Sequence, residues 1–382
     1  MTRQARAACK NTLAFAVVVI LSLGLLGASS AWSSQATSRD YLDIGIFSEV
    51  PDPGHPEGIV VAPDGTVYVS THQNVLELPN GPSRVFKYSE NGELLDEFEI
   101  EGQDPSRGSG VLGMAMDAEG VLYIVDRYPQ RIVALDPNTG EQWDYATFSQ
   151  VRDLCVPGPV LVLATQCAYA DDLAFTPDGT LFVTDVAQNL IWRVPPGGGE
   201  AEEWFTDTRI LSPFGPNGIE VMADGKTLMF AQTMTGPLDT LGNLLRGEPT
   251  LPATGKIFTL TVNDDGSPRD LETFWESEPG IGLDGIAIAE SGNVYAALGL
   301  GSNSVVAISP EGEEIKRNPA NEVENLLLEV PLDTPGSMKF LGDRLLVTNH
   351  APFVAMPGAF VVFDVYTGER GLDPFRPQLP SR

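Results

Sequence analysis

The chain repeats one pattern of apolar and polar positions: two short apolar runs on either side of a tight polar turn. The clearest copy is PNGIEVMADGKTLMFA, which begins at Pro216. Its apolar runs predict strands at residues 219–222 and 227–231, and the turn between them contains Asp224 and Gly225. Asp-Gly between apolar runs is a strong local signal of a β-hairpin. The pattern therefore predicts an antiparallel hairpin at this place.

The hairpin pattern occurs six times along the chain. Its copies open at Glu57, Leu112, Asp171, Asn217, Asp284 and, in a degenerate form, Pro335, at intervals of 46 to 67 residues. In the first five copies a turn glycine lies eight residues after the opening residue (Gly65, Gly120, Gly179, Gly225 and Gly292). Such intervals are typical of the blades of a β-propeller, in which radial stacking protects the edges of short sheets.

Further apolar runs extend each hairpin to a four-stranded unit. A third run lies at residues 84–89, 131–136, 190–195, 256–262, 304–309 and 359–365. A more polar fourth run often follows, for example at residues 94–100, 201–207, 271–277 and 324–330. The last unit has no fourth run of its own, and we expect residues 41–50 to pair with residues 359–365. The sequence thus predicts an all-β, six-bladed β-propeller over residues 37–382, whose last blade is closed by the N-terminal strand.

The first 36 residues have the pattern of a signal peptide and are not expected to belong to the propeller. Arg3, Arg6 and Lys10 precede an apolar run at residues 13–26, which is shorter than a membrane span, and Ala31 and Ala36 suit cleavage. The alternative is an uncleaved N-terminal anchor. The interpretation predicts a periplasmic or secreted protein with no stable membrane insertion after cleavage.

Charge and cysteine content agree with this interpretation. The formal net charge of −29 argues against binding to nucleic acid or to an anionic membrane. Cys155 and Cys167 lie in one loop, where they form a disulfide in an oxidising compartment or remain two buried thiols. Long insertions are expected at residues 145–170 and 233–254. The second contains a helix-like piece at residues 238–246, and it is either a lid or a surface loop.

The opening residues of the hairpins carry the candidate chemistry. In a propeller the first strand of each blade lines a central channel, so Glu57, Asp171, Asn217 and Asp284 are predicted to converge at one end, with Asp172 beside Asp171. Several carboxylates that face one point repel each other unless a cation neutralises them. Oxygen ligands without Cys or His suit Ca²⁺ or Mg²⁺. The alternative is that Asp, Asn and Glu before Gly are ordinary turn residues.

The segments PNGIEVMADG, LDGIAIAESG and HPEGIVVAPDG resemble hairpins of the gluconolactonase, regucalcin and senescence-marker-protein family, and more distantly those of paraoxonases and strictosidine-synthase-like propellers. The resemblance implies hydrolysis of a small lactone or ester. It also implies one divalent cation, Ca²⁺ or another such as Mg²⁺, Zn²⁺ or Mn²⁺, bound by Glu57, Asn217 and Asp284. Asp284 would be the general base. Asp171 and Asp172 stand where the family has an Asn-Asp pair that contacts substrate or metal, so Asp171 is a fourth candidate ligand.

Histidines offer an alternative base. His72 and His350 end the second strands of the first and last blades, which are neighbours in a closed ring, so they are expected on the same rim as the cation. A paraoxonase-like pair could replace Asp284 as the base, or the two could be rim residues that hydrogen-bond to loops. Asp126, Asp185 and Gln232 also end second strands, and they are interpreted as hydrogen-bond partners between blades.

Two other classes of function remain open at this point. A propeller without catalytic activity can serve as a platform that binds proteins or sugars. A strictosidine-synthase-like condensing enzyme would need no metal. No GxSxG or HExxH motif is present in the sequence, so the corresponding serine hydrolases and zinc proteases are disfavoured.

Overall fold

A computed structural model describes residues 39–72, 82–104, 110–153, 155, 167–236, 253–352 and 358–380. The chain separates into two compact units, Met1–Ser38 and Arg39–Arg382, and all described residues belong to the second. The predicted signal peptide therefore lies outside the described residues. Among the described residues, no helix is both long and apolar enough to span a membrane.

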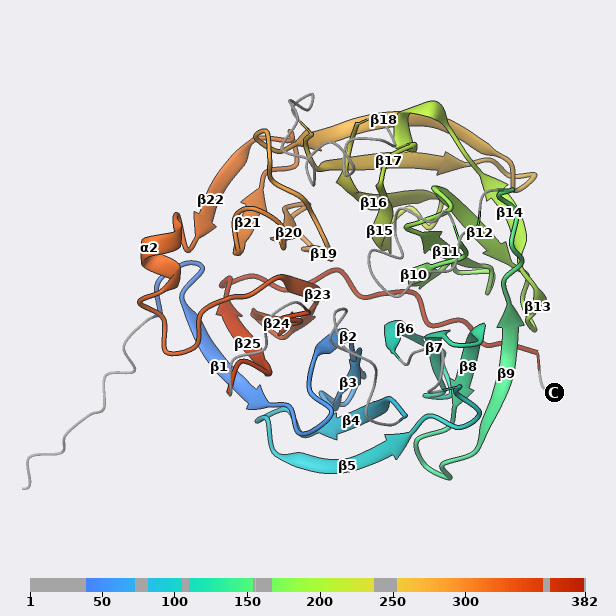
Figure 1. Ribbon diagram of the computed structural model, residues 1–382, viewed down its shortest axis with the longest axis horizontal. Helices are drawn as coiled ribbons and strands as arrows, with labels where there is room; N and C mark the ends of the chain where they lie inside the picture. Colours follow the sequence, from blue (N-terminus) through green and yellow to red (C-terminus); the bar gives the residue numbers. More distant parts are fainter. Residues whose placement is uncertain are drawn as a thin grey trace, which may run out of the picture. The chain divides into compact units, whose positions relative to one another are not determined.

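The second unit is a ring of six antiparallel sheets, and the predicted six-bladed β-propeller is confirmed (Figure 1). The strands of the first three blades are β2 (Pro56–Val61), β3 (Val67–Thr71), β4 (Arg84–Tyr88) and β5 (Leu94–Glu99); β6 (Val111–Met116), β7 (Leu122–Arg127), β8 (Gln130–Leu135) and β9 (Gln142–Thr147); and β10 (Ala170–Phe175), β11 (Leu181–Asp185), β12 (Leu190–Val194) and β14 (Glu202–Phe205).

The other three blades follow the same order from the centre of the ring outwards. Their strands are β15 (Phe214–Val221), β16 (Thr227–Met234), β17 (Lys256–Val262) and β18 (Pro268–Glu276); β19 (Ile286–Ile288), β20 (Val294–Leu298), β21 (Ser304–Ile308) and β22 (Glu314–Asn318); and β23 (Pro335–Leu341), β24 (Arg344–Asn349) and β25 (Val361–Tyr366). The short helices are η2 (Thr208–Ile210) and α2 (Glu322–Asn325).

The N-terminal strand closes the last blade, as the sequence predicts. Strand β1 (Ile44–Glu49) pairs antiparallel with β25, so the sixth sheet combines the two ends of the unit. Arg39 supports this closure because its guanidinium pairs with Asp364 on β25 and with Asp43. Closure in this way pairs the outer edge of β25 with the N-terminal strand.

The hydrophobic core consists of six clusters among the described residues, each shared by two neighbouring blades. The cluster between the last and first blades, for example, contains Val362 and Leu346 from one side and Ile59 and Phe86 from the other. Each blade therefore buries both faces against its neighbours. This arrangement explains why inner strands such as β2 and β3 are almost continuously buried and apolar on both faces, whereas outer strands such as β5 are mostly exposed.

The fourth strand of blade 5 was predicted at the wrong place. Residues 324–330 do not form a strand; instead Asn321 caps α2, its side chain accepting a hydrogen bond from the Glu324 backbone N–H. The fourth strand is β22, which follows β21 directly through the turn at Gly312 and pairs with it. Because a short hairpin connection lets β22 pair with the outer edge of β21, the apolar run at residues 324–330 is not needed as a strand and belongs to the segment that connects blades 5 and 6.

The insertion between blades 2 and 3 begins later than predicted. Residues 142–147 form β9, the fourth strand of blade 2, and β13 (Gly199–Glu200) adds to its edge in parallel. Cys155 and Cys167 form a disulfide, which decides between the two alternatives considered above. The proposed lid helix at residues 238–246 lies outside the described residues.

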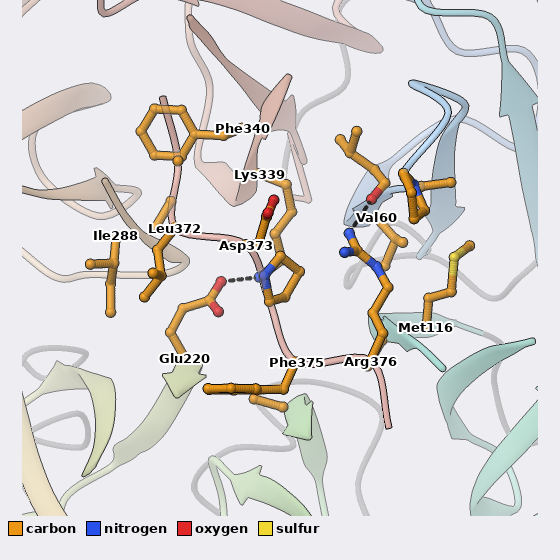
Figure 2. Close-up of a pocket in the computed structure, with 18 of the residues that line it drawn as sticks. Val60, Met116, Glu220, Ile288, Lys339, Phe340, Leu372, Asp373, Phe375 and Arg376 are labelled. Atoms are coloured by element: carbon orange, nitrogen blue, oxygen red, sulfur yellow. Dashed lines mark hydrogen bonds and ion pairs between the residues drawn. The ribbon is translucent and has the colours of Figure 1, made fainter. Parts of the chain in front are cut away.

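The C-terminal segment crosses the ring at the end of the channel where the first strands finish (Figures 1 and 2). Leu372 N–H donates to Ile288 of blade 5, Arg376 donates to the Val61 carbonyl of blade 1, and the Pro377 carbonyl accepts from Ala118 of blade 2. A cavity of about 330 Å³ lies beneath residues 370–376. The segment thus covers one end of the channel, opposite to the hairpin openings.

Candidate functional site

Backbone bulges place the hairpin openings at the channel. In five blades the pairing of the first two strands shifts by one residue at this point, and two residues of the first strand stay outside the paired register: 57–58, 112–113, 171–172, 217–218 and 336–337. In the sixth blade the residue equivalent to Glu57 is therefore Gly336 and not Pro335, which corrects the predicted frame. Bulges re-aim side chains and are common near active sites. The predicted site residues accordingly occupy one repeated structural position.

Glycines after the openings allow neighbouring blades to approach closely. A Cβ on Gly58 would lie 2.1 Å from the Leu112 carbonyl oxygen, and one on Gly113 would lie 2.2 Å from Asp172 Oδ1. In blade 3 the equivalent residue is Asp172, whose Oδ2 accepts a hydrogen bond from the Ile219 backbone of blade 4 at 3.1 Å. Asp172 therefore connects two blades, a structural role that the sequence analysis did not include.

Four buried carboxyl groups share the site electrostatically. Burial raises the pKa of Glu57 well above its usual range, and Asp171, Asp284 and Asp172 raise it further. Burial raises the pKa of Asp171 in the same way, with added effects of Asp284 and Asp172. The pKa of Asp284 rises to about 7 because of burial and the charge of Asp172. Asp171, Asp172 and Asp284 therefore lie close enough to Glu57 to raise its pKa.

A cationic side chain is among the main influences on the pKa of two of the four carboxyls. Arg127 lowers the pKa of Asp171, and Lys339 lowers that of Asp172. Lys339 forms an ion pair with Glu220 across the channel, seen in Figure 2. No cationic side chain is among the main influences on the pKa of Glu57 or Asp284. One oxygen of Glu57, Oε2, is buried without a hydrogen-bond partner among the described residues.

Asn217 is oriented by its neighbour on the second strand. Its Nδ2 donates to Thr233 Oγ1 at 3.1 Å, so its carbonyl oxygen faces away from Thr233. Within the described residues, no three Asp, Glu, His or Cys side chains come close enough to form a metal centre by themselves. Asp171 therefore does not complete a three-carboxylate centre with Glu57 and Asp284. The predicted ligand set of Glu57, Asn217 and Asp284 contains only two carboxylates and one amide, so the absence of a group of three Asp, Glu, His or Cys side chains among the described residues does not exclude it.

His350, His72 and Arg127 occupy equivalent positions in three consecutive blades. Each directly follows the residue of the second strand that makes the last pair with the first strand, in blades 6, 1 and 2 respectively. The rings of His72 and His350 are 5.0 Å apart, and Arg127 Nη1 donates to His72 Nε2 at 2.8 Å. His72 Nε2 is thus an acceptor, because a guanidinium cannot accept. His72 positions Arg127 in this arrangement.

His350 differs from His72 in its environment. Burial lowers its pKa to about 3, with further lowering by His55 and Arg127, so the ring is neutral at physiological pH. Its Nε2 is buried and has no hydrogen-bond partner among the described residues. His55 Nδ1 is 3.2 Å from the His350 carbonyl, so His55 lies beside His350.

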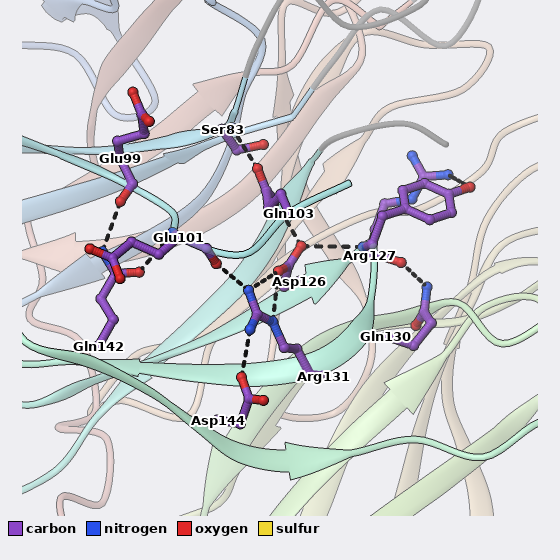
Figure 3. A network of polar contacts seen from close by, with 11 residues as sticks. Ser83, Glu99, Glu101, Gln103, Asp126, Arg127, Gln130, Arg131, Gln142 and Asp144 are labelled. Atoms are coloured by element: carbon purple, nitrogen blue, oxygen red, sulfur yellow. Dashed lines mark hydrogen bonds and ion pairs between the residues drawn. The ribbon is translucent and has the colours of Figure 1, made fainter. Parts of the chain in front are cut away.

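Arg127 was missed by the sequence analysis, which read Asp126 as the end of the second strand. Asp126 pairs with Val111 and is equivalent to Thr71, so Arg127 is the counterpart of His72. Figure 3 shows that Asp126 accepts a hydrogen bond from Gln103 and pairs with Arg131. Asp126 also accepts a hydrogen bond from the Tyr128 backbone N–H. These contacts lie mainly within its own blade, not between blades, and they fix the turn that carries Arg127.

The raised pKa values predict that the protein depleted of divalent cations loses stability as pH rises from 5 to 8. The native carboxyls bind protons more tightly than unfolded ones, so stability falls between the unfolded pKa near 4 and the native value, about 7 for Asp284. A tenfold difference in proton affinity between the two states corresponds to about 1.4 kcal/mol of stability. Thermal unfolding in chelator should give a midpoint several degrees lower at pH 8. Equal midpoints at the two pH values would contradict this electrostatic description, and Asp284→Asn should reduce the difference.

Similar solved structures show the fold. No protein-family model and no curated protein sequence matches the chain. A calcium-binding protein, regucalcin, from Agrobacterium tumefaciens is 19% identical with a TM-score of 0.55, covering 88% of this chain and 99% of its own. A luciferin-regenerating enzyme is 13% identical with a TM-score of 0.57, covering 87% of this chain and 98% of its own. A gluconolactonase from Xanthomonas campestris is 17% identical with a TM-score of 0.53, covering 85% of this chain and 89% of its own. The predicted resemblance is confirmed for the propeller architecture.

Proposed function

We propose that the protein is a divalent-cation-dependent hydrolase of a small lactone or carboxylic ester. The observation that carries the proposal is the pair of buried carboxyls, Glu57 and Asp284, with no cationic side chain among the main influences on them. Similar structures include a protein named as calcium-binding and one named as a gluconolactonase, which agrees with this choice.

The residues present fit a hard divalent cation. Glu57 Oε2 is a buried oxygen without a partner among the described residues, and the Asn217 amide oxygen is turned away from Thr233. Glu57, Asn217 and Asp284 would therefore hold the cation, through oxygen atoms of the kind that Ca²⁺ prefers. When bound, such a cation polarises a carbonyl and stabilises the charge that develops on its oxygen.

Asp284 is the better candidate for the general base. A general base works best when its pKa is near the working pH, and the pKa of Asp284 is about 7 without a bound cation. Asp284 would have a lower pKa with a cation bound, whereas burial and the charge of Asp172 act in the opposite direction. His350, with a pKa of about 3, is neutral but weakly basic, and His72 uses Nε2 to accept from Arg127. The two histidines are thus better suited to bind and orient groups.

The proposal is tested with a panel of γ- and δ-lactones and aryl esters and protein from residue 39 onwards. We expect hydrolysis with calcium present, loss of at least most of the activity in chelator, and recovery when calcium returns. Full activity in chelator would favour a metal-free enzyme instead. No hydrolysis of any compound, despite cation binding, would favour a binding platform.

We also propose export, because residues 1–36 read as a signal peptide and the Cys155–Cys167 disulfide suits an oxidising compartment. The acidic charge of −29 agrees with an extracellular or periplasmic setting that contains divalent cations. N-terminal sequencing of the protein recovered from the periplasm or medium checks this, and an intact Met1 in the cytoplasm would contradict it.

A further inference from the structure

Arg127 is a buried arginine without a carboxylate at ion-pair distance among the described residues. It is 2% exposed, Nη1 donates to His72, and Nη2 donates to the Tyr128 hydroxyl at 3.3 Å. Its Nε is buried and has no hydrogen-bond partner among the described residues. A charge removed from water in this way is costly unless another group compensates it.

The guanidinium of Arg127 is held in one orientation at the end of the channel where the hairpins open, which is also where the cation is proposed to bind. It stacks on the ring of Tyr169, 4.4 Å from the centroid, and lies 5.1 Å from that of Tyr128. Gly110 permits this packing, since a Cβ there would lie 2.8 Å from His72. The charge of Arg127 acts on Asp171 and His350, both of which belong to the candidate site.

We propose that Arg127 binds a carboxylate group of the substrate, so that the substrate is a lactone or ester that carries a second, ionised carboxyl group. The inference rests on the proposed function for the reaction, but the binding subsite follows from Arg127 alone. A planar guanidinium matches the two oxygens of a carboxylate. One guanidinium offsets a single negative charge, which favours a carboxylate over a doubly charged phosphate.

The position of Arg127 also orients the substrate. Arg127 acts on Asp171 of blade 3, whereas no cationic side chain is among the main influences on Glu57 or Asp284. The substrate carboxylate would therefore lie towards blades 2 and 3. The scissile carbonyl would lie towards Glu57 and Asp284. The other cationic side chain that acts on these carboxyls, Lys339, is already paired with Glu220, so Arg127 determines specificity.

The test compares a γ-butyrolactone carboxylate with its neutral carboxamide. Calorimetry with the calcium-loaded wild-type protein should give a dissociation constant roughly 10- to 100-fold lower for the carboxylate, as expected for a hydrogen-bonded charged group. In Arg127→Gln the two constants should become equal, while that of the carboxamide stays the same. Arg84→Gln removes a charge from an exposed pair with Glu97 and serves as the matched control, with the preference intact.

The outcomes separate this inference from the proposed function. Preferential binding of the carboxylate without hydrolysis supports the subsite and contradicts the hydrolase. Hydrolysis with equal affinity for both compounds in the wild type overturns the subsite and leaves the hydrolase standing. This comparison needs no variant, so it decides the matter even if Arg127→Gln does not fold. Arg127→Lys should recover only part of the preference, because lysine lacks the planar fork.

Discussion

Calcium should bind the wild-type protein at one site and fail to bind the double variant Glu57→Gln/Asn217→Ala. The variant removes the carboxylate whose buried oxygen lacks a partner and the amide oxygen that faces away from Thr233. Calorimetric titration of chelator-treated protein measures the effect. At a calcium concentration 100 times the dissociation constant, binding should also stabilise the wild-type fold by about 2.7 kcal/mol. The variant should show no such gain.

A matched control keeps this test specific to the channel. Glu97→Gln/Asn138→Ala changes the same residue types on exposed parts of blades 1 and 2, and it should leave calcium binding unchanged. The variant itself should be at least as stable as the wild type in chelator, because removing Glu57 relieves repulsion from Asp171 and Asp284. Calcium binding by the double variant with wild-type affinity would place the cation elsewhere and refute the assigned ligands.

The hairpins could be predicted from sequence because their signals are local. A turn glycine with positive φ, such as Gly225, is required wherever the two runs of a hairpin meet, so its spacing reveals each blade. Closure of the ring by residues 41–50 was also predictable, since the sixth unit has only three strands. Residues 324–330 were misread because an apolar run in a connecting segment has the same composition as an edge strand.

The site residues could be predicted only where they occupy the same position in each copy of the hairpin pattern. Glu57, Asp171, Asn217 and Asp284 share one repeat position, and the carboxyls of Asp171 and Asp284 raise the pKa of Glu57. Arg127 could have been found by aligning the ends of second strands, where it corresponds to His72 and His350. Its contacts with Tyr169 and Tyr128 could not, because they depend on how blades 2 and 3 pack.

Asp284→Ala should abolish hydrolysis, and Asp284→Asn should separate the two roles assigned to this residue. Asparagine keeps an oxygen for the cation but cannot accept a proton, so calcium binding should weaken without disappearing. Hydrolysis should fall by about 10²- to 10⁴-fold, the usual contribution of a general base. Rates at saturating calcium, together with calcium titrations of the same preparations, measure both effects.

The alternative base gives the opposite pattern. If His350 accepts the proton, the His350→Gln variant should lose activity. The Asp284→Asn variant should then keep its activity at calcium concentrations that saturate the site. The lowered pKa of His350, about 3, argues against this, because so weak a base gains little from its position. The pH dependence of the wild-type rate adds a second criterion. Activity that depends on Asp284 should rise as its carboxyl ionises towards neutral pH, whereas a base with a pKa of about 3 is already unprotonated and would give a rate independent of pH in that range.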